Sequence, residues 1–118
     1  MFIINCKNYD EIAGDKIIKL AKLSEKISKK YKVPIAIAPP HHLIPLITKF
    51  HVTILAQHLD DKKIGSTTGF MIPEIVKKSR VNGALINHSE HRISPREITN
   101  LVKRLKKLKM KTVVCVKN

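Results

Sequence analysis

The feature that most constrains this chain is a regular alternation of short apolar runs with longer segments that carry helical signals. The pattern recurs roughly every 25 residues, which is room for a strand, a helix and their connections. Alternating strands and helices imply right-handed crossovers and therefore a parallel sheet. We predict an α/β fold with four helices and with five strands, at residues 2–4, 35–38, 52–56, 83–86 and 112–116.

The second apolar run narrows the architecture. Ile35-Ala36-Ile37-Ala38 is apolar at every position, as in a strand that is covered on both faces. An open doubly wound sheet and the first part of a (β/α)8 barrel, which needs about 250 residues when complete, both contain such strands. A dinucleotide-binding sheet should show a glycine-rich turn after its first strand, and Asn5-Cys6-Lys7-Asn8 has no glycine. We therefore predict that residues 1–118 form a single incomplete (β/α)8 barrel domain.

Two of the four helices have clear terminal signals. Ser94-Pro95-Arg96-Glu97 is a capping box with proline at the first helical position. Asp15 is the predicted N-cap of a helix that runs to Tyr31. The two shorter helices are predicted at residues 43–50 and 73–78. The predicted buried stripes are Ile17, Leu20, Ala21, Ile27 and Tyr31, flanked by Leu23, in the first helix and Ile98, Leu101, Val102, Leu105 and Leu108 in the last.

The charge is strongly basic, with 23 Lys and Arg against 9 Asp and Glu and a net charge of +14. Such a field attracts phosphorylated metabolites, nucleic acid or an acidic partner. Nucleic-acid binding is not favoured, because aromatic residues make up only 4% and there is no Trp for base stacking. Most of the charge is predicted to lie on solvated helix faces, including Lys103, Arg104, Lys106, Lys107 and Lys109.

The two cysteines and the lack of long apolar runs bear on location. Cys6 and Cys115 lie far apart beside apolar runs, which indicates two buried free thiols in a reducing compartment. No run approaches the length of a membrane span, and the amino terminus lacks a signal-peptide pattern. We expect a cytoplasmic protein that does not associate with membranes.

The densest polar cluster follows the fourth apolar run. Leu85 to Arg92 begins as the end of a strand and turns into polar residues, and barrels place their chemistry at such strand ends. His88 can act there as an acid, a base or a neutral hydrogen-bond donor. A metal site formed with His58 and His91 is not favoured, because no carboxylate or Cys accompanies them at helical spacing. His41, His42 and His51 are predicted to be solvated, and neither a metal nor a cofactor is expected.

Four motifs occur along the chain in a fixed order. They are Asn5-Cys6-Lys7, Ala56-Gln57-His58, Gly65-Ser66-Thr67-Thr68-Gly69 and Asn87-His88-Ser89-Glu90-His91-Arg92. The loop that contains the third motif, residues 60–69, is long for a strand-to-helix connection, which also suggests a function for it. In this order the four motifs resemble those of the triosephosphate isomerase family in its archaeal form. The resemblance covers the whole chain, and it implies the amino-terminal part of a TIM barrel.

The resemblance implies an activity and roles for named residues. The family interconverts dihydroxyacetone phosphate and glyceraldehyde 3-phosphate through an enediolate. Lys7 would hold the phosphorylated substrate and offset the growing negative charge, and Asn5 would donate a hydrogen bond to the same oxygens. His88 would be a neutral electrophile at the carbonyl, a role for which this family is itself a standard example. Glu90 would orient Lys7.

The resemblance also implies an interface and an incomplete site. Thr68, in the loop from Gly65 to Gly69, would support the site of a second copy in a homo-oligomer. The family's catalytic carboxylate follows the sixth strand, and its phosphate-binding loops follow strands six to eight, so the predicted five strands lack both. We expect little or no activity from the 118 residues alone unless a complementary carboxyl-terminal half-barrel chain completes them. The alternative is a non-catalytic basic protein that binds phosphates or nucleic acid.

Overall fold

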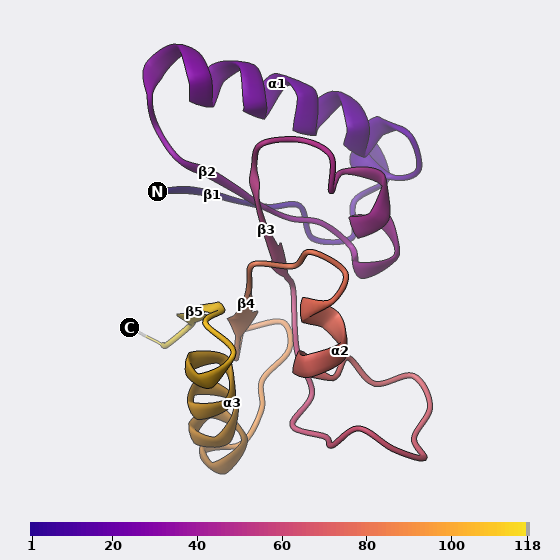
Figure 1. The fold of residues 1–118 in the computed structure, drawn as a ribbon, viewed down its shortest axis with the longest axis vertical. Helices are drawn as coiled ribbons and strands as arrows, with labels where there is room; N and C mark the ends of the chain where they lie inside the picture. Colours follow the sequence, from indigo (N-terminus) through magenta and orange to yellow (C-terminus); the bar gives the residue numbers. More distant parts are fainter. Residues whose placement is uncertain (118) are drawn as a thin grey trace. The chain divides into compact units, whose positions relative to one another are not determined.

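The computed structural model describes residues 1–117, which include five strands and three α-helices. The chain separates into two compact units, Met1–Gln57 and His58–Asn118, and each unit is described by itself (Figure 1). All strand pairs within the two units are parallel, as the alternating sequence pattern predicts.

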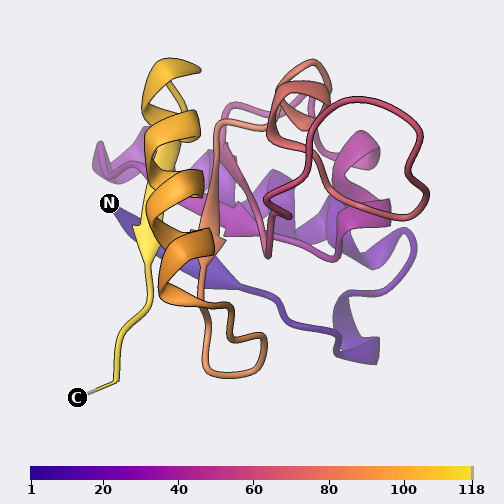
Figure 2. The same cartoon turned by 90° about the horizontal axis from the view of Figure 1, so that it is seen from below.

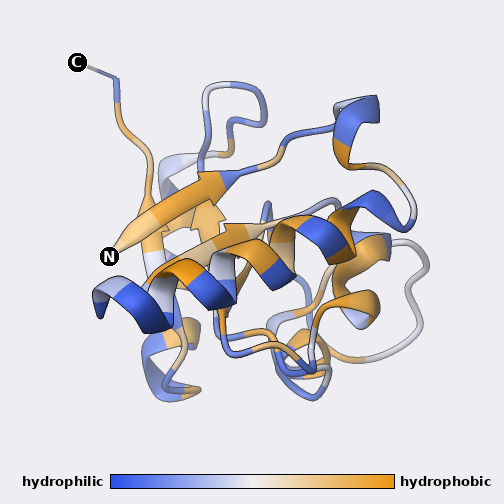
Figure 3. Cartoon of the chain, turned by 90° about the horizontal axis from the view of Figure 1, so that it is seen from above, coloured by the Kyte–Doolittle hydropathy of each residue, from blue (hydrophilic) through white to orange (hydrophobic). Residues whose placement is uncertain are grey.

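The first unit holds three short strands and one long helix. Strand β1 (Phe2–Asn5) pairs with β2 (Ile35–Ala38), from Phe2 opposite Ile35 to Asn5 opposite Ala38. Strand β2 also pairs with β3 (Thr53–Ala56). The 16-residue helix α1 (Lys16–Tyr31) packs against β2, and its surface alternates apolar with hydrophilic stretches whereas β1 and β2 are apolar along most of their length (Figure 3).

The second unit holds two strands and two helices. Strand β4 (Gly83–Ile86) pairs residue by residue with β5 (Lys111–Val114), and helix α3 (Pro95–Lys107) packs along β5 (Figure 2). The shorter helix α2 (Pro73–Lys77) follows a wide loop. Gly83 is required where β4 meets β5, because a Cβ at this position would lie only 2.3 Å from the Lys111 carbonyl oxygen.

The second predicted helix is wrong in type. Residues 43–50 do not form an α-helix; instead His41–Leu46 is a 3-10 helix, and a second, unpredicted 3-10 helix spans Asp10–Ile12. Pro45 lies inside the first of these segments and has no backbone N–H for an α-helical hydrogen bond. Proline also disfavours the α conformation at the preceding residue, Ile44, so a short 3-10 segment is formed instead.

The predicted buried stripe of α1 is only half correct. Ile17 and Ala21 are fully buried, but Ile27 is 39% and Tyr31 63% exposed, and Leu23 is exposed as well. A four-residue strand is about 13 Å long, whereas a 16-residue helix is about 24 Å long. The last turns of α1 therefore extend beyond the strands that would cover them.

The two cysteines differ in burial. Cys6 is buried, as predicted, and burial raises the pKa of its thiol to about 11, so the thiol is neutral. Cys115 is only partly buried, contrary to the prediction, because it lies just beyond the end of β5. Within residues 1–117, no helix has both the length and the apolar character needed to cross a membrane.

Candidate active site

The carboxyl end of β1 carries the first two candidate residues. Asn5 is the last residue of β1, and its Oδ1 accepts a hydrogen bond of 3.1 Å from the backbone N–H of Lys7. Lys7 has φ 53°, a left-handed conformation that costs a non-glycine residue about 1–3 kcal/mol. Such strained residues are concentrated at functional sites, and here the side chain of Asn5 supports the strained turn.

Gln57, the residue directly after β3, holds this strand end in place. Its Nε2 donates to the carbonyl oxygens of Lys7 at 2.9 Å and Ala38 at 3.1 Å, so one amide group joins the ends of β1 and β2. Its backbone N–H donates to His41 Nε2 at 3.0 Å. The prediction that His41 is solvated is therefore wrong, because the ring is half-buried and accepts a backbone hydrogen bond.

The carboxyl end of β4 forms the second part of the candidate site. Asn87 follows β4 directly and has φ 61°, a left-handed conformation that asparagine tolerates better than most residues. Its Nδ2 donates to the Cys115 carbonyl oxygen and its Oδ1 accepts from the Ile93 N–H, both at 3.1 Å. Arg92 Nη1 donates to the Asn87 carbonyl oxygen at 2.7 Å, which closes the loop from the other side.

His88 lies inside the loop that Asn87 and Arg92 close. The backbone N–H of Glu90 lies 3.1 Å from His88 Nδ1, and the His91 N–H donates to the His88 carbonyl oxygen at 2.8 Å. Since a backbone N–H can only donate, Nδ1 is the acceptor, and the proton of the neutral ring is on Nε2. The Glu90 carboxylate lies farther away, at 3.4 Å from Nδ1, and its side chain is 58% exposed. His88 is thus set up as an Nε2–H donor.

The wide loop before α2, residues 60–71, is closed at its base by two reciprocal hydrogen bonds. The Asp60 N–H donates to the Met71 carbonyl oxygen, and the Met71 N–H donates to Asp60 Oδ2, both at 2.8 Å. Residues 62–70 between them are all exposed. Burial of the Asp60 carboxyl group opposes ionisation, but the hydrogen bonds from Met71 and then His58 outweigh it and lower the pKa of Asp60.

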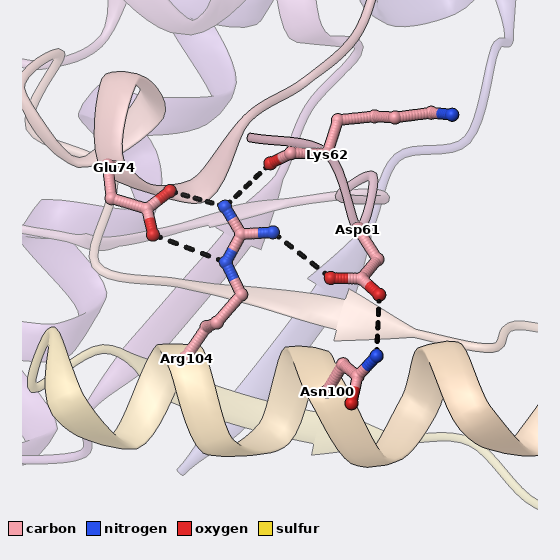
Figure 4. A network of polar contacts seen from close by, with 5 residues as sticks. All are labelled: Asp61, Lys62, Glu74, Asn100 and Arg104. Carbon is pink, nitrogen blue, oxygen red and sulfur yellow. Dashed lines mark hydrogen bonds and ion pairs between the residues drawn. The ribbon is translucent and has the colours of Figure 1, made fainter. Parts of the chain in front are cut away.

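A partly buried arginine holds the start of the same loop (Figure 4). Arg104, on α3, donates from Nη1 to Asp61 at 3.1 Å and from Nη2 to the Lys62 carbonyl oxygen at 2.7 Å. Its Nε and Nη2 form a fork with the two carboxylate oxygens of Glu74 at 3.2 and 2.5 Å. The hydrogen bond from Arg104 is the largest influence that lowers the pKa of Glu74. The prediction that Arg104 belongs to a solvated face is wrong, since its side chain is only 20% exposed.

Comparison with known proteins decides the family. The family model described as triosephosphate isomerase matches residues 1–118. The chain belongs to the triosephosphate isomerase family. Relatives with this name include those of Cenarchaeum symbiosum, 52% identical over all of this chain, and Saccharolobus solfataricus, 42% identical over 98%. The chain covers 53% and 52% of these two proteins, so it spans about half the length of the curated relatives that it matches.

A solved structure supports the fold independently. The crystal structure of the triosephosphate isomerase of Bartonella henselae matches 98% of this chain with a TM-score of 0.78, and the match covers 49% of that protein. The identity is only 19%, so this match concerns the fold alone. Family membership, the resemblance to archaeal relatives and the partial TIM barrel are confirmed.

The sequence reasoning named most of the strand-end residues but missed their supports. Asn5 and Lys7 lie together in the first unit, and His88 and Glu90 lie together in the second. From the sequence, Gln57 is recognised only as part of a motif. Its position as the first polar residue after β3, at the same sheet edge as Lys7, is the signal that identifies it as a support. Nothing in the sequence indicates that Arg104 pairs with the carboxylates of Asp61 and Glu74.

The loop from Gly65 to Gly69 has the exposure expected of an interface segment. All five residues are exposed, and a short turn is closed by the Thr67 N–H on the Gly65 carbonyl oxygen at 2.9 Å. Gly69 has φ 83°, which only glycine adopts without strain. The tip of the loop therefore contains a defined turn, and the role of Thr68 remains a prediction.

Proposed function

We propose that this chain supplies the electrophilic part of a triosephosphate isomerase active site, which interconverts dihydroxyacetone phosphate and glyceraldehyde 3-phosphate. The observation that supports this best is the hydrogen bond from the Glu90 N–H to His88 Nδ1. It reserves the Nε2–H of a neutral ring for the substrate. A neutral donor can follow the negative charge as it moves between the two oxygens of an enediolate.

In the proposed mechanism, residues at the ends of β1 and β4 have different roles. His88 Nε2–H polarises the substrate carbonyl and stabilises the enediolate, while the Lys7 ammonium group neutralises the phosphate and the developing charge. Asn5 donates to the same oxygens, and Glu90 orients Lys7. The strained backbone at Lys7, which Asn5 and Gln57 support, fits a residue that must be fixed before substrate binds.

The general base of this reaction is proposed to come from outside the 118 residues. The chain spans about half the length of its relatives, and the family's catalytic carboxylate follows a sixth strand, beyond the five strands of these 118 residues. Because general-base catalysis contributes about 10²–10⁴-fold, we expect very low turnover from the 118 residues alone.

The test is an isomerisation assay with three proteins. The first is the 118-residue chain, and the second is a chimera in which this chain is followed by the part of the Cenarchaeum symbiosum relative that it does not cover. The third is that uncovered part alone. We expect turnover from the chimera at least 10²-fold above either half, since only the chimera holds both electrophile and base. A folded chimera with no turnover would refute the proposal.

We also propose that the loop from Gly65 to Gly69 docks onto a second copy, with Thr68 supporting that copy's site. The support is the exposure of the loop together with its closed base at Asp60 and Met71. Deleting the threonine side chain by Thr68→Ala should weaken self-association of the chimera, whereas Thr99→Ala on α3 should not. Equal self-association of the two variants, measured by sedimentation, would count against this partner.

Polyanion binding is a second candidate function, and one feature favours it. A depression of about 440 Å³ in the second unit is lined by Lys77, Arg80, Lys109 and Lys111, with no carboxylate among its lining residues. Binding of a polyphosphate there should weaken steeply with salt and survive His88→Ala. The isomerase proposal predicts that His88→Ala abolishes turnover in the chimera, so turnover and not polyanion binding separates the two functions.

A further inference from the structure

Two histidine rings connect the His88–His91 turn (the His88 turn) with the wide loop before α2. His58 and His91 are stacked, with ring centroids 3.6 Å apart and the planes inclined by only 7°. His58 is buried, with 8% exposure, whereas His91 is exposed. The stacking of these two rings has no role in the isomerase mechanism proposed above.

The buried ring is tied to the base of the wide loop. His58 Nε2 lies 2.9 Å from Asp60 Oδ1, while Asp60 Oδ2 accepts the Met71 N–H at 2.8 Å. Both oxygens of one carboxylate are therefore used, one by the histidine and one by the backbone that closes the loop. The His58 ring and the closed base of the loop therefore share one carboxylate.

The exposed ring is tied to the candidate electrophile. His91 and His88 are the two ends of one turn, which the hydrogen bond from the His91 N–H to the His88 carbonyl oxygen closes at 2.8 Å. The same turn places the Glu90 N–H on His88 Nδ1. A contiguous series of contacts thus runs from Met71 through Asp60, His58 and His91 to His88.

We infer that His58 and His91 are positioning residues that hold the base of the wide loop and the His88 turn in one fixed arrangement. A substitution that disturbs the base of the wide loop should therefore change the His88 turn, and the reverse should hold as well. The link to catalysis rests on the proposed isomerase function, in which the loop docks on a second copy and His88 polarises the substrate. The coupling itself requires no turnover, so it can be tested on the 118-residue chain.

Two substitutions at His91 separate stacking from bulk. His91→Phe keeps a flat ring that can stack on His58, whereas His91→Leu keeps apolar volume without a ring. Because His91 is exposed, neither change removes core packing. His42→Leu, at another exposed histidine, is the matched control.

Two measurements on the folded chain report the two ends. Hydrogen exchange of the Met71 amide reports the closed base of the loop, and the ¹⁵N chemical shift of His88 Nδ1 reports its hydrogen bond with Glu90. We expect His91→Leu to accelerate Met71 exchange about tenfold or more and to shift the Nδ1 resonance. His91→Phe should keep both near the unmodified chain, and His42→Leu should change neither.

The reverse perturbation starts from the loop. In Asp60→Asn a single side-chain oxygen remains for the two donors, His58 Nε2 and the Met71 N–H. This substitution should therefore loosen the base of the loop and shift the His88 Nδ1 resonance as well. Unchanged Met71 exchange in His91→Leu would overturn the inference, as would equal effects of Leu and Phe. An unchanged His88 signal in Asp60→Asn, with the rest of the chain folded, would overturn it too.

Turnover of the chimera adds a separate readout. If the chimera isomerises substrate, His91→Leu should lower kcat about tenfold with little change in KM, and His91→Phe should restore it. A chimera without turnover would refute the proposed function and leave the exchange and ¹⁵N measurements to decide the positioning role.

Discussion

At the scale of single residues, a side-chain amide makes bridging hydrogen bonds at the ends of both β1 and β4. Asn87 combines a φ of 61° with hydrogen bonds to the Cys115 carbonyl oxygen and the Ile93 N–H. Asn87→Ala loses both bonds and places a Cβ in the left-handed region, so we expect the free energy of unfolding to fall by about 1–3 kcal/mol.

Asn87→Gly separates the two contributions. Glycine loses the same hydrogen bonds but adopts the backbone conformation without strain, so it should cost about 1 kcal/mol less than alanine. Denaturant unfolding of the two variants, with the exposed Asn8→Ala as a control, measures the difference. Glycine that destabilises as much as alanine would mean that the left-handed backbone at Asn87 carries no strain.

Gln57 is the second such amide, and it supports Lys7. Gln57→Leu leaves the carbonyl oxygens of Lys7 and Ala38 without this donor, at an expected cost of about 1–2 kcal/mol. Gln57→Glu should destabilise more at neutral pH, because a carboxylate would face the same two oxygens. Thermal unfolding compares the two variants, and a Glu variant more stable than the Leu variant would contradict this role.

At the scale of elements, the start of α3 is the best-determined helix end. Ser94 Oγ accepts the Glu97 N–H and Glu97 Oε1 accepts the Ser94 N–H, both at 3.2 Å, so the predicted capping box is formed. Ser94→Ala should lower the free energy of unfolding by about 1 kcal/mol. Ser66→Ala, in the exposed loop, should change it by less than half of that, and equal effects would show that the cap adds nothing.

Two hydrogen-bonded carboxylates, Glu74 beside Arg104 and Asp60 at the base of the loop, make the second unit sensitive to acid. The pKa values of Glu74 and Asp60 are lowered from 4.5 and 3.8, so the unfolded chain binds more protons than the folded chain at acidic pH. The stability that the two ionised carboxylates contribute to the folded chain is fully present above their ordinary pKa values. It is lost as the pH falls through the lower pKa values of the folded state. Unfolding free energies measured from pH 7 to pH 3 should therefore fall below about pH 5.

Glu74→Gln tests the cause of that loss. A neutral amide cannot lose a charge on acidification, so the fall in stability between pH 5 and pH 3 should be smaller than in the unmodified chain. Glu11→Gln, at an exposed carboxylate, is the matched control. An unchanged pH dependence in Glu74→Gln would show that the contact with Arg104 does not control acid stability.

Elements were predictable where one local signal was dominant. Continuous apolar runs gave β2 and β4 at their observed bounds, and the capping box gave the start of α3. The prediction of an α-helix around Pro45 is wrong because helical spacing takes no account of the missing proline N–H. The exposed end of α1 failed because helix length relative to strand length is a property of packing, not of spacing.

At the scale of the whole molecule, apolar residues on the terminal strands remain open to solvent. Met1, Phe2 and Ile3 on or beside β1 are exposed, as are Val114 and Val116 at the end of β5. Among residues 1–117, β1 pairs only with β2 and β5 only with β4. Exposed edges of this kind favour pairing with other chains.

We therefore expect the 118-residue chain to self-associate. Its apparent unfolding midpoint should rise with protein concentration, because association stabilises the folded state. Phe2→Lys, which places a charge on the exposed edge, should reduce both the association and the concentration dependence. A monodisperse monomer with a midpoint independent of concentration, measured by sedimentation and thermal unfolding, would contradict this expectation.

The family could be predicted from the sequence because three of its four motifs lie at the ends of β1, β3 and β4, and the fourth lies in the loop before α2. The supports of the site could not, because they depend on distant partners: Gln57 bonds to Lys7, 50 positions away, and Arg104 bonds to Asp61, 43 positions away. Residue type alone does not identify such partners. The stack of His58 on His91 is hidden for the same reason.

The most direct test of the central claim is the effect of His88→Gln on isomerisation by the chimera. Glutamine is close in size but has no ring Nε2–H held in place by the Glu90 N–H. We predict that kcat falls about 10²–10³-fold with little change in KM, because a donor that acts mainly in the transition state is lost. A kcat within twofold of the unmodified chimera would contradict the assignment of His88 as the electrophile.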